Sequence, residues 1–446
     1  MTFGAMLTEM TIFGVFLIAG FLIRELIKPL QKLFIPSSII GGVIALVGGQ
    51  QILGLWEVPA SFSSYSGTLI RFVMCSIIFG VTLNLDKMKS YGDYMMVVHS
   101  VYGWQMALGI GLGALFCKIW PSLPTGWGFQ GVQSFYGGHG TAGAAGAVFE
   151  EITASTDVTS IGMVLATFGL VFAMVFGMMV VNFGVRRGWA TFVKEPQKQP
   201  PSFYGGLLPK EEQKSIGTAL TSSISVNAVA LQFAWILAAM FVGEKLFALI
   251  GTFLPVVKQM PLLTYDTVGG LILYPILKMV KLDTFVDKKT VSQLSGCALE
   301  ILILGAVATL NISVVISNAV PLLLFTAIMC GLTVVWPLFM AHKTCSEQWF
   351  EKALMIIGQS TGATPTGLAL VRAVDPNSEC CAPDAHGIYS GLTFWTTFFT
   401  ALLPMSLADG NISVGIIAGL IQFIVCACIG FGIFGTLKRR SKSKNT

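Results

Sequence analysis

Long apolar runs constrain this chain more than any other feature of its sequence. A helix needs about 20 mostly apolar residues to cross the roughly 30 Å hydrocarbon core of a bilayer. Only 11% of the residues are charged and 54% are hydrophobic, whereas a soluble domain carries about 25% charged residues. We therefore predict an all-α polytopic membrane protein with eleven transmembrane helices, which argues against a disordered chain or a soluble enzyme. The predicted spans are Met6–Ile23, Ser37–Leu55, Gly67–Leu85, Tyr94–Cys117, Val158–Val185, Thr218–Ile250, Pro261–Val280, Val291–Ile316, Ala319–Ala341, Gly387–Ala408 and Ile412–Phe434.

The positions of lysine and arginine predict how these spans are oriented. With the N-terminus outside, 23 basic residues fall on the inner side and only Lys118, Lys245 and Lys258 on the outer side. Basic residues concentrate on the cytoplasmic side of membrane proteins. The first run has no basic residue before Arg24 and no small-residue cleavage pattern after it, so we interpret it as a span. The C-terminus is then predicted to be cytoplasmic.

Two further stretches are partly apolar, near residues 127–151 and 352–374. Counting either stretch as a full crossing would invert every later segment and remove the charge asymmetry. We therefore predict that both are re-entrant hairpins, which enter and leave the membrane on the same side.

Three short motifs recur with similar spacing and predict an internal repeat. Gly41-Gly42 reappears as Gly269-Gly270, and the triplet ending at Asn84 reappears in the one ending at Asn311. The third pair consists of the glycine-rich segments 137–141 and 362–366. All offsets lie between 225 and 228 residues, and such self-similarity indicates repeated structural units.

The repeat divides the chain into four parts. Residues 1–185 and 217–408 each hold five spans and one hairpin, and 186–216 is a basic, proline-containing cytoplasmic linker. Residues 409–446 add one more span and a basic cytoplasmic tail. Because five is odd, the second unit begins on the opposite side of the membrane, so the two repeats have inverted topology. This organisation is typical of secondary transporters.

The glycine-rich segments are predicted to be the tips of the two hairpins, near the bilayer midplane. Irregular backbone at that depth is tolerated only where it lines a cavity or is buried in protein. An exit helix is expected to begin at Thr141, and Thr364 followed by Pro365 resembles an N-cap and first turn. Two helix N-termini facing each other would attract an anion, most simply a carboxylate. The predicted substrate-binding residues are Gly138, His139, Gly140, Thr141, Gly362, Ala363, Thr364 and Thr366.

The incoming arms of the hairpins end in backbone carbonyls, which suit a hard cation such as sodium. The two asparagines occupy matched positions in the repeats, although interhelical hydrogen bonding would also explain them. A glutamate within the eighth span is either a sodium or proton site or a structural partner of a hydroxyl group. Arg71 is expected to extend towards the outer interface. The predicted cation ligands are Asn84, Asn311, Gly137, Ser360 and Glu300.

The motif Gly137-Gly138-His139-Gly140-Thr141 and its partner Gly362-Ala363-Thr364-Pro365-Thr366, on hairpins of inverted five-span repeats, resemble the bacterial sodium/glutamate symporters. The resemblance covers roughly residues 5–408. It implies sodium-coupled uptake of glutamate across the cytoplasmic (inner) membrane by a homodimer, with elevator-type alternating access. The chain departs from the family pattern at Leu370, where an asparagine is usual.

Other functions fit the sequence less well. A sodium- or proton-coupled carrier of another organic anion or dicarboxylate remains the alternative. An intramembrane enzyme would need a nucleophile and a base, and Thr141 near His139 has no supporting motif. A channel does not suit the repeat organisation. The cysteines show no zinc spacing, and we expect no cofactor and no nucleic-acid partner.

Overall fold

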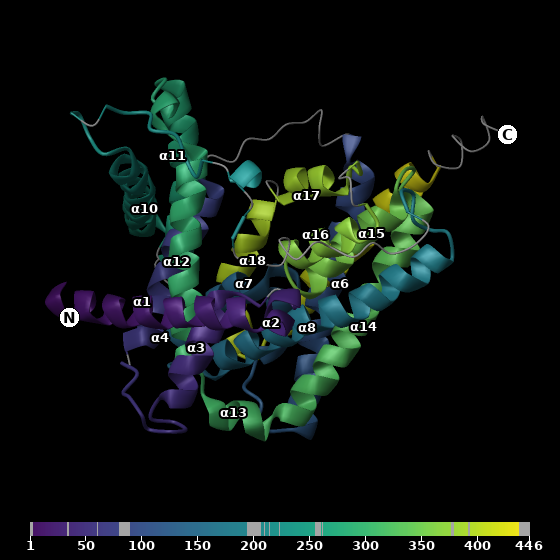
Figure 1. The fold of residues 1–446 in the computed structure, drawn as a ribbon, viewed down its shortest axis with the longest axis horizontal. Helices are drawn as coiled ribbons and strands as arrows, with labels where there is room; N and C mark the ends of the chain where they lie inside the picture. Colours follow the sequence, from purple (N-terminus) through teal and green to yellow (C-terminus); the bar gives the residue numbers. More distant parts are fainter. Residues whose placement is uncertain are drawn as a thin grey trace.

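The structure is a computed structural model that describes residues 3–33, 35–59, 61–79, 90–193, 207–208, 210–213, 215–222, 224–254, 260, 262–375, 379–390 and 393–436. Every regular element in these ranges is helical. Figure 1 shows two neighbouring sets of helices, one on the left around α11 and α12 and one on the right around α8 and α14. The predicted all-α membrane fold is therefore confirmed at the level of its helical class.

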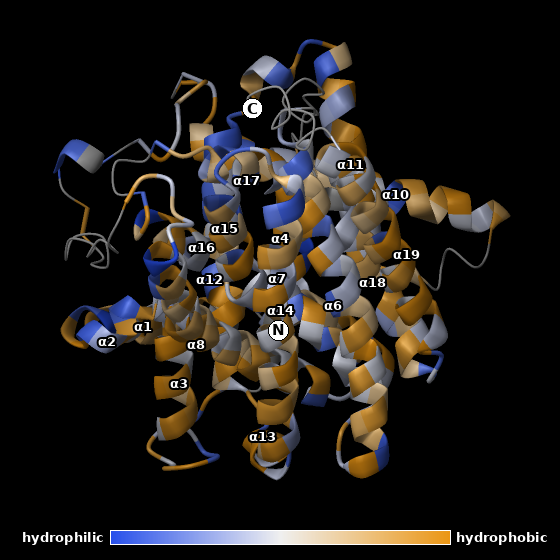
Figure 2. Ribbon diagram, turned by 90° about the vertical axis from the view of Figure 1, so that its right-hand side faces the viewer, coloured by the Kyte–Doolittle hydropathy of each residue, from blue (hydrophilic) through white to orange (hydrophobic). Residues whose placement is uncertain are grey.

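Seven helices are long and apolar enough to cross a membrane, and they correspond to seven of the eleven predicted spans. They are α1 (Phe3–Leu26), α6 (Gly92–Ile119), α8 (Asp157–Arg186), α10 (Ala228–Phe253), α12 (Lys288–Ala308), α14 (Ala319–Thr344) and α19 (Ser413–Ile429) with the π-helical turn η6 (Gly430–Phe434). Figure 2 shows hydrophobic residues along most of the helices and hydrophilic residues gathered near α17 (Ala382–Ser390). The chain is thus a multi-pass membrane protein.

The other four predicted spans correspond to shorter or less apolar helices. They are α3 (Ser37–Gly48), α4 (Ser61–Ile78), α11 (Leu262–Met279) and α18 (Thr396–Ala408). The predicted span Gly387–Ala408 is not one helix, because α17 ends at Ser390 and α18 begins at Thr396. The second predicted span was too long, because α3 ends at Gly48. The Trp56 ring would collide with any side chain at Gly48, and its Nε1 donates to the Ala45 carbonyl at 3.1 Å. The returning chain therefore folds over the end of this helix.

The eighth predicted span was also too long. Helix α12 ends at Ala308, and a short helix, α13 (Ile312–Ser317), follows it. Thr309 lies just beyond the end of α12, and its hydroxyl donates to the Gly305 carbonyl at 2.8 Å. The last predicted residues of this span therefore form a corner rather than a continuous helix.

The first set of helices comprises α1, α3, α4, α10, α11 and α12. Two kinds of contact occur twice in this set. Helix α1 packs on α3, and α10 packs in the same way on α11. Helix α3 in turn contacts α12, and α11 contacts α4. The closest approaches use glycine. A side chain at Gly20 or Gly41 would strike backbone of the opposite helix, and the same holds for Gly243 and Gly269. These crossings bring helix backbones together as small residues do in membrane bundles.

The second set comprises α6, α7 (Gln130–Thr153), α8, α14, α15 (Trp349–Thr361), α16 (Thr364–Arg372), α17, α18 and α19. Helix α7 packs against α8 and α18, and α15 packs against α14, α16 and α8. Helix α19 lies along α6, where Gly103 and Gly419 face each other closely. The added C-terminal helix therefore belongs to the second set.

Local sequence explains where two helices of the first set begin. Asn227 Oδ1 accepts hydrogen bonds from the N–H groups of Val229 and Ala230 at 3.0 and 3.1 Å, which caps α10. Asp287 caps α12 by accepting from the Thr290 N–H at 3.1 Å. Such caps satisfy backbone donors that have no partner within the helix.

Arg71 does not extend to the interface as expected. Its Nε lies 2.5 Å from Asp266 Oδ2 and its Nη2 lies 2.5 Å from Glu244 Oε1, so it joins α4, α11 and α10. Asp266 is fully buried, whereas the Glu244 side chain is 44% exposed. Because a buried carboxylate is costly without a partner, this ion pair holds α4, α10 and α11 of the first set together.

Candidate functional site

The first predicted hairpin tip is a break within α7. Gly138 has φ 68° and ψ −161°, a conformation that essentially only glycine adopts, while the residues on either side are helical. Its neighbour Gly137 is glycine for a different reason, since a Cβ there would overlap the Thr141 side chain. The break falls at Gly138, so the exit arm begins at His139 and not at Thr141 as predicted.

The second predicted tip joins α15 to α16. Ala363 is extended, with φ −162° and ψ 167°, and is the N-cap, whereas Thr364 is the first helical residue. The prediction that Thr364 caps the helix was therefore wrong by one residue. Pro365 lies in the first turn as expected, where its missing N–H costs nothing. Thr364 itself is exposed.

Each hairpin is fastened by a threonine hydroxyl. Thr141 Oγ1 donates to the Gln133 carbonyl at 2.6 Å, and Thr366 Oγ1 donates to the Gly358 carbonyl at 2.7 Å. Both bonds reach back eight residues, across the helix breaks. These hydroxyls therefore hold the arms of each hairpin together rather than pointing freely into a cavity.

The two tips meet. A Cβ built on Gly138 would lie 3.3 Å from the Gly362 carbonyl oxygen, and Gln359 Nε2 donates to the Tyr136 carbonyl at 2.8 Å. Gln105 of α6 donates from Nε2 to the Ser360 carbonyl at 2.9 Å. The carbonyl of Ser360, one of the predicted cation ligands, thus accepts a glutamine amide in this structure, and so does the carbonyl of Tyr136, next to the predicted ligand Gly137.

The sequence analysis did not predict a role for Gln359 or for Gln133, the glutamine at the matching position of the first hairpin. A signal existed, because Gln133-Ser134 and Gln359-Ser360 precede the two tips with a spacing that matches the repeat offset. Gln133 Oε1 accepts from Thr400 Oγ1 at 3.0 Å, and its buried Nε2 has no partner among the described residues. The matched glutamines therefore have different partners.

His139 belongs to the first tip but is turned towards α8. It is buried, and its Nε2 lies 3.1 Å from Thr167 Oγ1. Thr167 in turn donates to the Met163 carbonyl at 3.0 Å. If Thr167 donates there, His139 Nε2 is the donor to its hydroxyl oxygen, and the imidazole shapes the tip through this bond.

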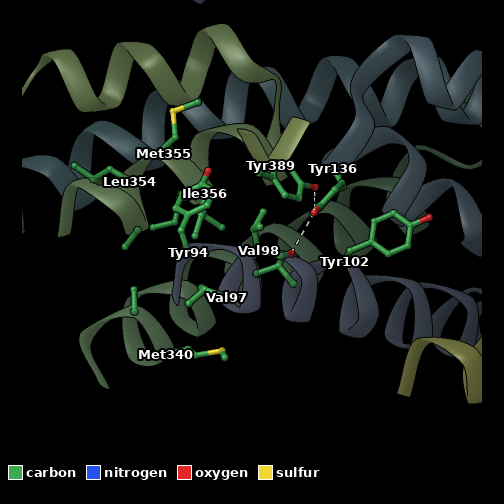
Figure 3. Close-up of a cluster of buried hydrophobic side chains, with 14 of the residues drawn as sticks. Tyr94, Val97, Val98, Tyr102, Tyr136, Met340, Leu354, Met355, Ile356 and Tyr389 are labelled. Carbon is green, nitrogen blue, oxygen red and sulfur yellow. Dashed lines mark hydrogen bonds between the residues drawn. The ribbon is translucent and has the colours of Figure 1, made fainter. Parts of the chain in front are cut away.

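An aromatic cluster of Tyr94, Tyr102, Tyr136 and Tyr389 adjoins the first tip. Tyr136 Oη is hydrogen-bonded to Tyr389 Oη and donates to the Val98 carbonyl at 3.2 Å (Figure 3). Tyr102 stacks edge-on against Tyr136, with ring centroids 4.9 Å apart. Tyr94, on the same helix as Tyr102, faces Tyr389 at 6.2 Å. The cluster ties the first hairpin to α6 and α17.

The remaining predicted cation ligands lie elsewhere. Asn311 is at the corner between α12 and α13, where its Nδ2 donates to Asp157 Oδ1 at 3.1 Å and its N–H donates to Ser160 Oγ at 3.0 Å. These hydrogen bonds connect it to the start of α8 rather than to the tips. Asn84 lies outside the described residues.

Glu300 lies in the middle of α12, a helix that contacts α7. Its Oε2 is buried without a hydrogen-bond partner among the described residues. The adjacent Leu299 is the nearest neighbour of Gly140, since a Cβ on this glycine would lie 3.2 Å from Leu299 Cδ1. Adjacent residues on a helix point in different directions, so this contact places α12 at the first tip without fixing where the Glu300 carboxylate lies.

Paired broken hairpins within apolar helices define a class of membrane protein, the secondary transporters. A model of the sodium/glutamate symporter family matches residues 1–377. The chain belongs to the sodium/glutamate symporter family. The predicted transporter, as opposed to an enzyme, is thereby confirmed, and sodium is a coupling ion rather than a cofactor.

Characterised relatives agree with this assignment. The chain is similar to the sodium/glutamate symporter of Escherichia coli K12, with 25% identity over 357 residues, which covers 77% of this chain and 82% of the relative. It is also similar to the sodium/glutamate symporter of Haemophilus influenzae, with 22% identity over 367 residues, or 80% and 86% of the two chains.

Proposed function

We propose that this protein carries glutamate into the cell by sodium-coupled symport. The observation that carries the proposal is the meeting of the two broken hairpins at Gly138 and Gly362, in a chain of this family. The N-terminus of α16 carries partial positive charge, and its first residue, Thr364, is exposed. This end of the helix suits a carboxylate. The substrate-binding residues proposed from the sequence are therefore retained, with Thr141 and Thr366 acting as fasteners of the hairpins.

Sodium is proposed to bind beside the same tips. The carbonyl groups of Gly137 and Ser360 and the carboxylate of Glu300 are oxygen ligands of the kind that sodium prefers. The buried Oε2 of Glu300, which has no partner among the described residues, supports its inclusion. Asn311 is better explained by its bonds at the start of α8.

Inverted repeats are proposed as the basis of the fold. The pairing of α1 with α3 recurs as α10 with α11, and each crossing contains a glycine on both helices. The contact between α7 and α18 likewise corresponds to that between α15 and α8. These matched pairs support a two-fold relation between residues 1–185 and 217–408.

Elevator-type movement is proposed as the transport mechanism. The second set of helices carries both tips, and it meets the first set where α7 lies against α4 and α12. At that boundary Leu302 of α12 lies close to Gly143 of α7. Small and apolar side chains of this kind can slide past one another, whereas the hydrogen bonds from Asn311 to Asp157 and Ser160 would have to break during the movement.

The membrane and the assembly are also proposals. The basic residues support an external N-terminus and a cytoplasmic C-terminus in a bacterial cytoplasmic membrane. A homodimer is proposed from the resemblance to the family. Only 11% and 17% of the residues in the most apolar stretches of α1 and α10 are buried, which leaves room for such an interface.

Uptake into proteoliposomes tests the proposed function. Purified protein is reconstituted, and accumulation of labelled glutamate is compared with and without an inward sodium gradient. Accumulation that depends on the gradient supports symport, and equal accumulation in both conditions rejects sodium coupling. Competition by unlabelled aspartate, malate and citrate distinguishes glutamate from the alternative organic anions.

Leu370, where the family pattern usually has an asparagine, bears on the choice between glutamate and another organic anion. This residue is fully buried, and its side chain fills the space beside Gly177 of α8. The departure from the family pattern therefore changes packing behind α16 rather than the exposed first turn of that helix. The residue at this position is therefore no argument for another anion.

A further inference from the structure

Three side chains form a hydrogen-bonded chain that ends at the second tip. Tyr94 Oη of α6 lies 3.0 Å from His386 Nδ1 of α17. His386 Nε2 lies 3.1 Å from Thr364 Oγ1, on the first residue of α16. Tyr94 and His386 are buried, whereas Thr364 is exposed. The chain therefore runs from the interior of the second set of helices to the exposed end of α16.

The end of α16 offers few other donors. Pro365 has no N–H, and the N–H of Thr366 donates to the Ala363 carbonyl at 3.1 Å. The N–H of Gly367 is bonded to the same carbonyl at 3.2 Å. An anion approaching this helix would therefore depend on the N–H and the hydroxyl of Thr364, and the direction of that hydroxyl matters.

The hydrogen positions in the chain follow from the partners of Tyr94. Among the described residues, His386 Nδ1 is the only hydrogen-bond partner of Tyr94 Oη. A buried hydroxyl that fails to donate costs about 1–3 kcal/mol, so Tyr94 donates to Nδ1. The neutral imidazole then carries its hydrogen on Nε2, which donates to Thr364 Oγ1. The Thr364 hydroxyl is left with its own hydrogen to donate outward.

We propose that Tyr94 and His386 are positioning residues, which orient the Thr364 hydroxyl as a hydrogen-bond donor to a carboxylate of the transported substrate. This inference rests on the proposed function and adds to it the residues that determine how the substrate is held. Without the chain, the Thr364 hydroxyl can turn its hydrogen towards His386 and present only lone pairs to the anion. The substrate is then bound more weakly, although the hairpin keeps its fold.

A double-mutant cycle tests the proposal. The variants Tyr94→Phe, Thr364→Val and their combination are reconstituted, and KM and Vmax of sodium-driven glutamate uptake are measured per inserted transporter. A hydrogen bond to a charged group contributes about 1.5–3 kcal/mol, so each single variant is expected to raise KM at least about tenfold. Because Tyr94 acts through Thr364, the double variant should have the KM of Thr364→Val alone.

Two further variants separate positioning from a general structural effect. Thr264→Val removes a buried hydroxyl from α11, one that has no hydrogen-bond partner among the described residues, and should leave KM unchanged. His386→Gln keeps an N–H donor for Thr364 and should retain a lower KM than His386→Leu. A merely structural defect would lower Vmax or the amount of inserted protein instead.

The outcomes distinguish this inference from the proposed function. Suppose that the wild type takes up glutamate. If KM is unchanged in Tyr94→Phe, or if the KM increases of the two single variants multiply in the double variant, the positioning role of Tyr94 and His386 is overturned and the proposed function stands. Absence of glutamate uptake by the wild type would reject the proposed substrate, and the cycle is then measured with the carboxylate that the competitor panel identifies. Uptake of none of the tested carboxylates would overturn both.

Discussion

Gln359 donates its side-chain amide to the backbone carbonyl of Tyr136 at 2.8 Å and thereby joins the two hairpins. The donor lies in the last turn of α15 and the acceptor two residues before the break in α7. Both residues are buried. The two tips are therefore held in a fixed relation, as a single binding site requires.

Replacing this amide should impair transport. In Gln359→Leu the Tyr136 carbonyl loses its donor, and an unsatisfied buried acceptor costs about 1–3 kcal/mol. We expect sodium-driven uptake to fall at least tenfold while the protein still inserts into the membrane. Gln422→Leu is a matched control, because Gln422 Nε2 donates to the His99 carbonyl at 2.9 Å between α19 and α6. Equal loss of uptake in both variants would show that the hairpin bridge has no special role.

Gly138 should tolerate no side chain. Its φ of 68° strains any other residue by about 1–3 kcal/mol, and a Cβ would also press on the Gly362 carbonyl. Uptake by Gly138→Ala should therefore be abolished at normal membrane levels. Gly296→Ala serves as the control, because nothing lies within 4 Å of a Cβ at this position in α12. Near-normal uptake by Gly138→Ala would contradict the assignment of the tip.

The ion pair of Arg71 should act on stability. Arg71→Leu leaves the fully buried Asp266 without its partner, which costs about 3–5 kcal/mol for a buried pair. We expect a lower Tm of the solubilised protein, and recovery of most of the loss in Arg71→Leu/Asp266→Leu. If the double variant is less stable than the single one, the pair is not the source of the effect.

Asp287 should make stability depend on pH. Burial acts to raise the pKa of its carboxyl, but hydrogen bonds from Thr290 and from the Thr218 N–H outweigh this and lower the pKa. A carboxyl whose pKa is lower in the folded state stabilises the fold at pH values above its pKa in the unfolded chain, which is about 3.9. This stabilisation is lost as the pH falls through the pKa of the folded state.

Asp287→Ala should therefore destabilise the protein by about 1 kcal/mol at neutral pH, as loss of a helix cap does. The difference from wild type should narrow between about pH 5 and about pH 3, measured by thermal unfolding at each pH. Asp283→Ala is the control, because no hydrogen bond to the Asp283 carboxylate is found among the described residues. A difference that stays constant with pH would contradict the role of the carboxylate.

Much of this architecture can be predicted from the sequence, because glycine-rich breaks and apolar runs are local signals. The breaks fall at Gly138 and beside Gly362, within the predicted tips. Helix ends were less accurate. The end of α3 depends on Trp56 folding back over Gly48, and no local pattern encodes that contact.

The partners of the polar side chains could not be predicted. Gln359 and Tyr136 are 223 residues apart, and Arg71 is 195 residues from Asp266. Such pairs are defined by packing of whole helices. The amide side chain of Asn311 predicted a cation ligand. In the structure Asn311 lies at the corner between α12 and α13, where it forms hydrogen bonds with Asp157 and Ser160. Composition alone does not distinguish these two roles.

Protection of an engineered cysteine tests the central claim, that the meeting hairpin tips form the binding site. Pro365→Cys places a thiol on the exposed first turn of α16, in a background where the exposed Cys297 and Cys428 are replaced by serine. Labelling by a membrane-impermeant thiol reagent is followed in vesicles of both orientations. We predict labelling from each face in turn, slowed strongly when sodium and glutamate are present together. Labelling from one face only, at a rate that sodium and glutamate leave unchanged, would contradict the account.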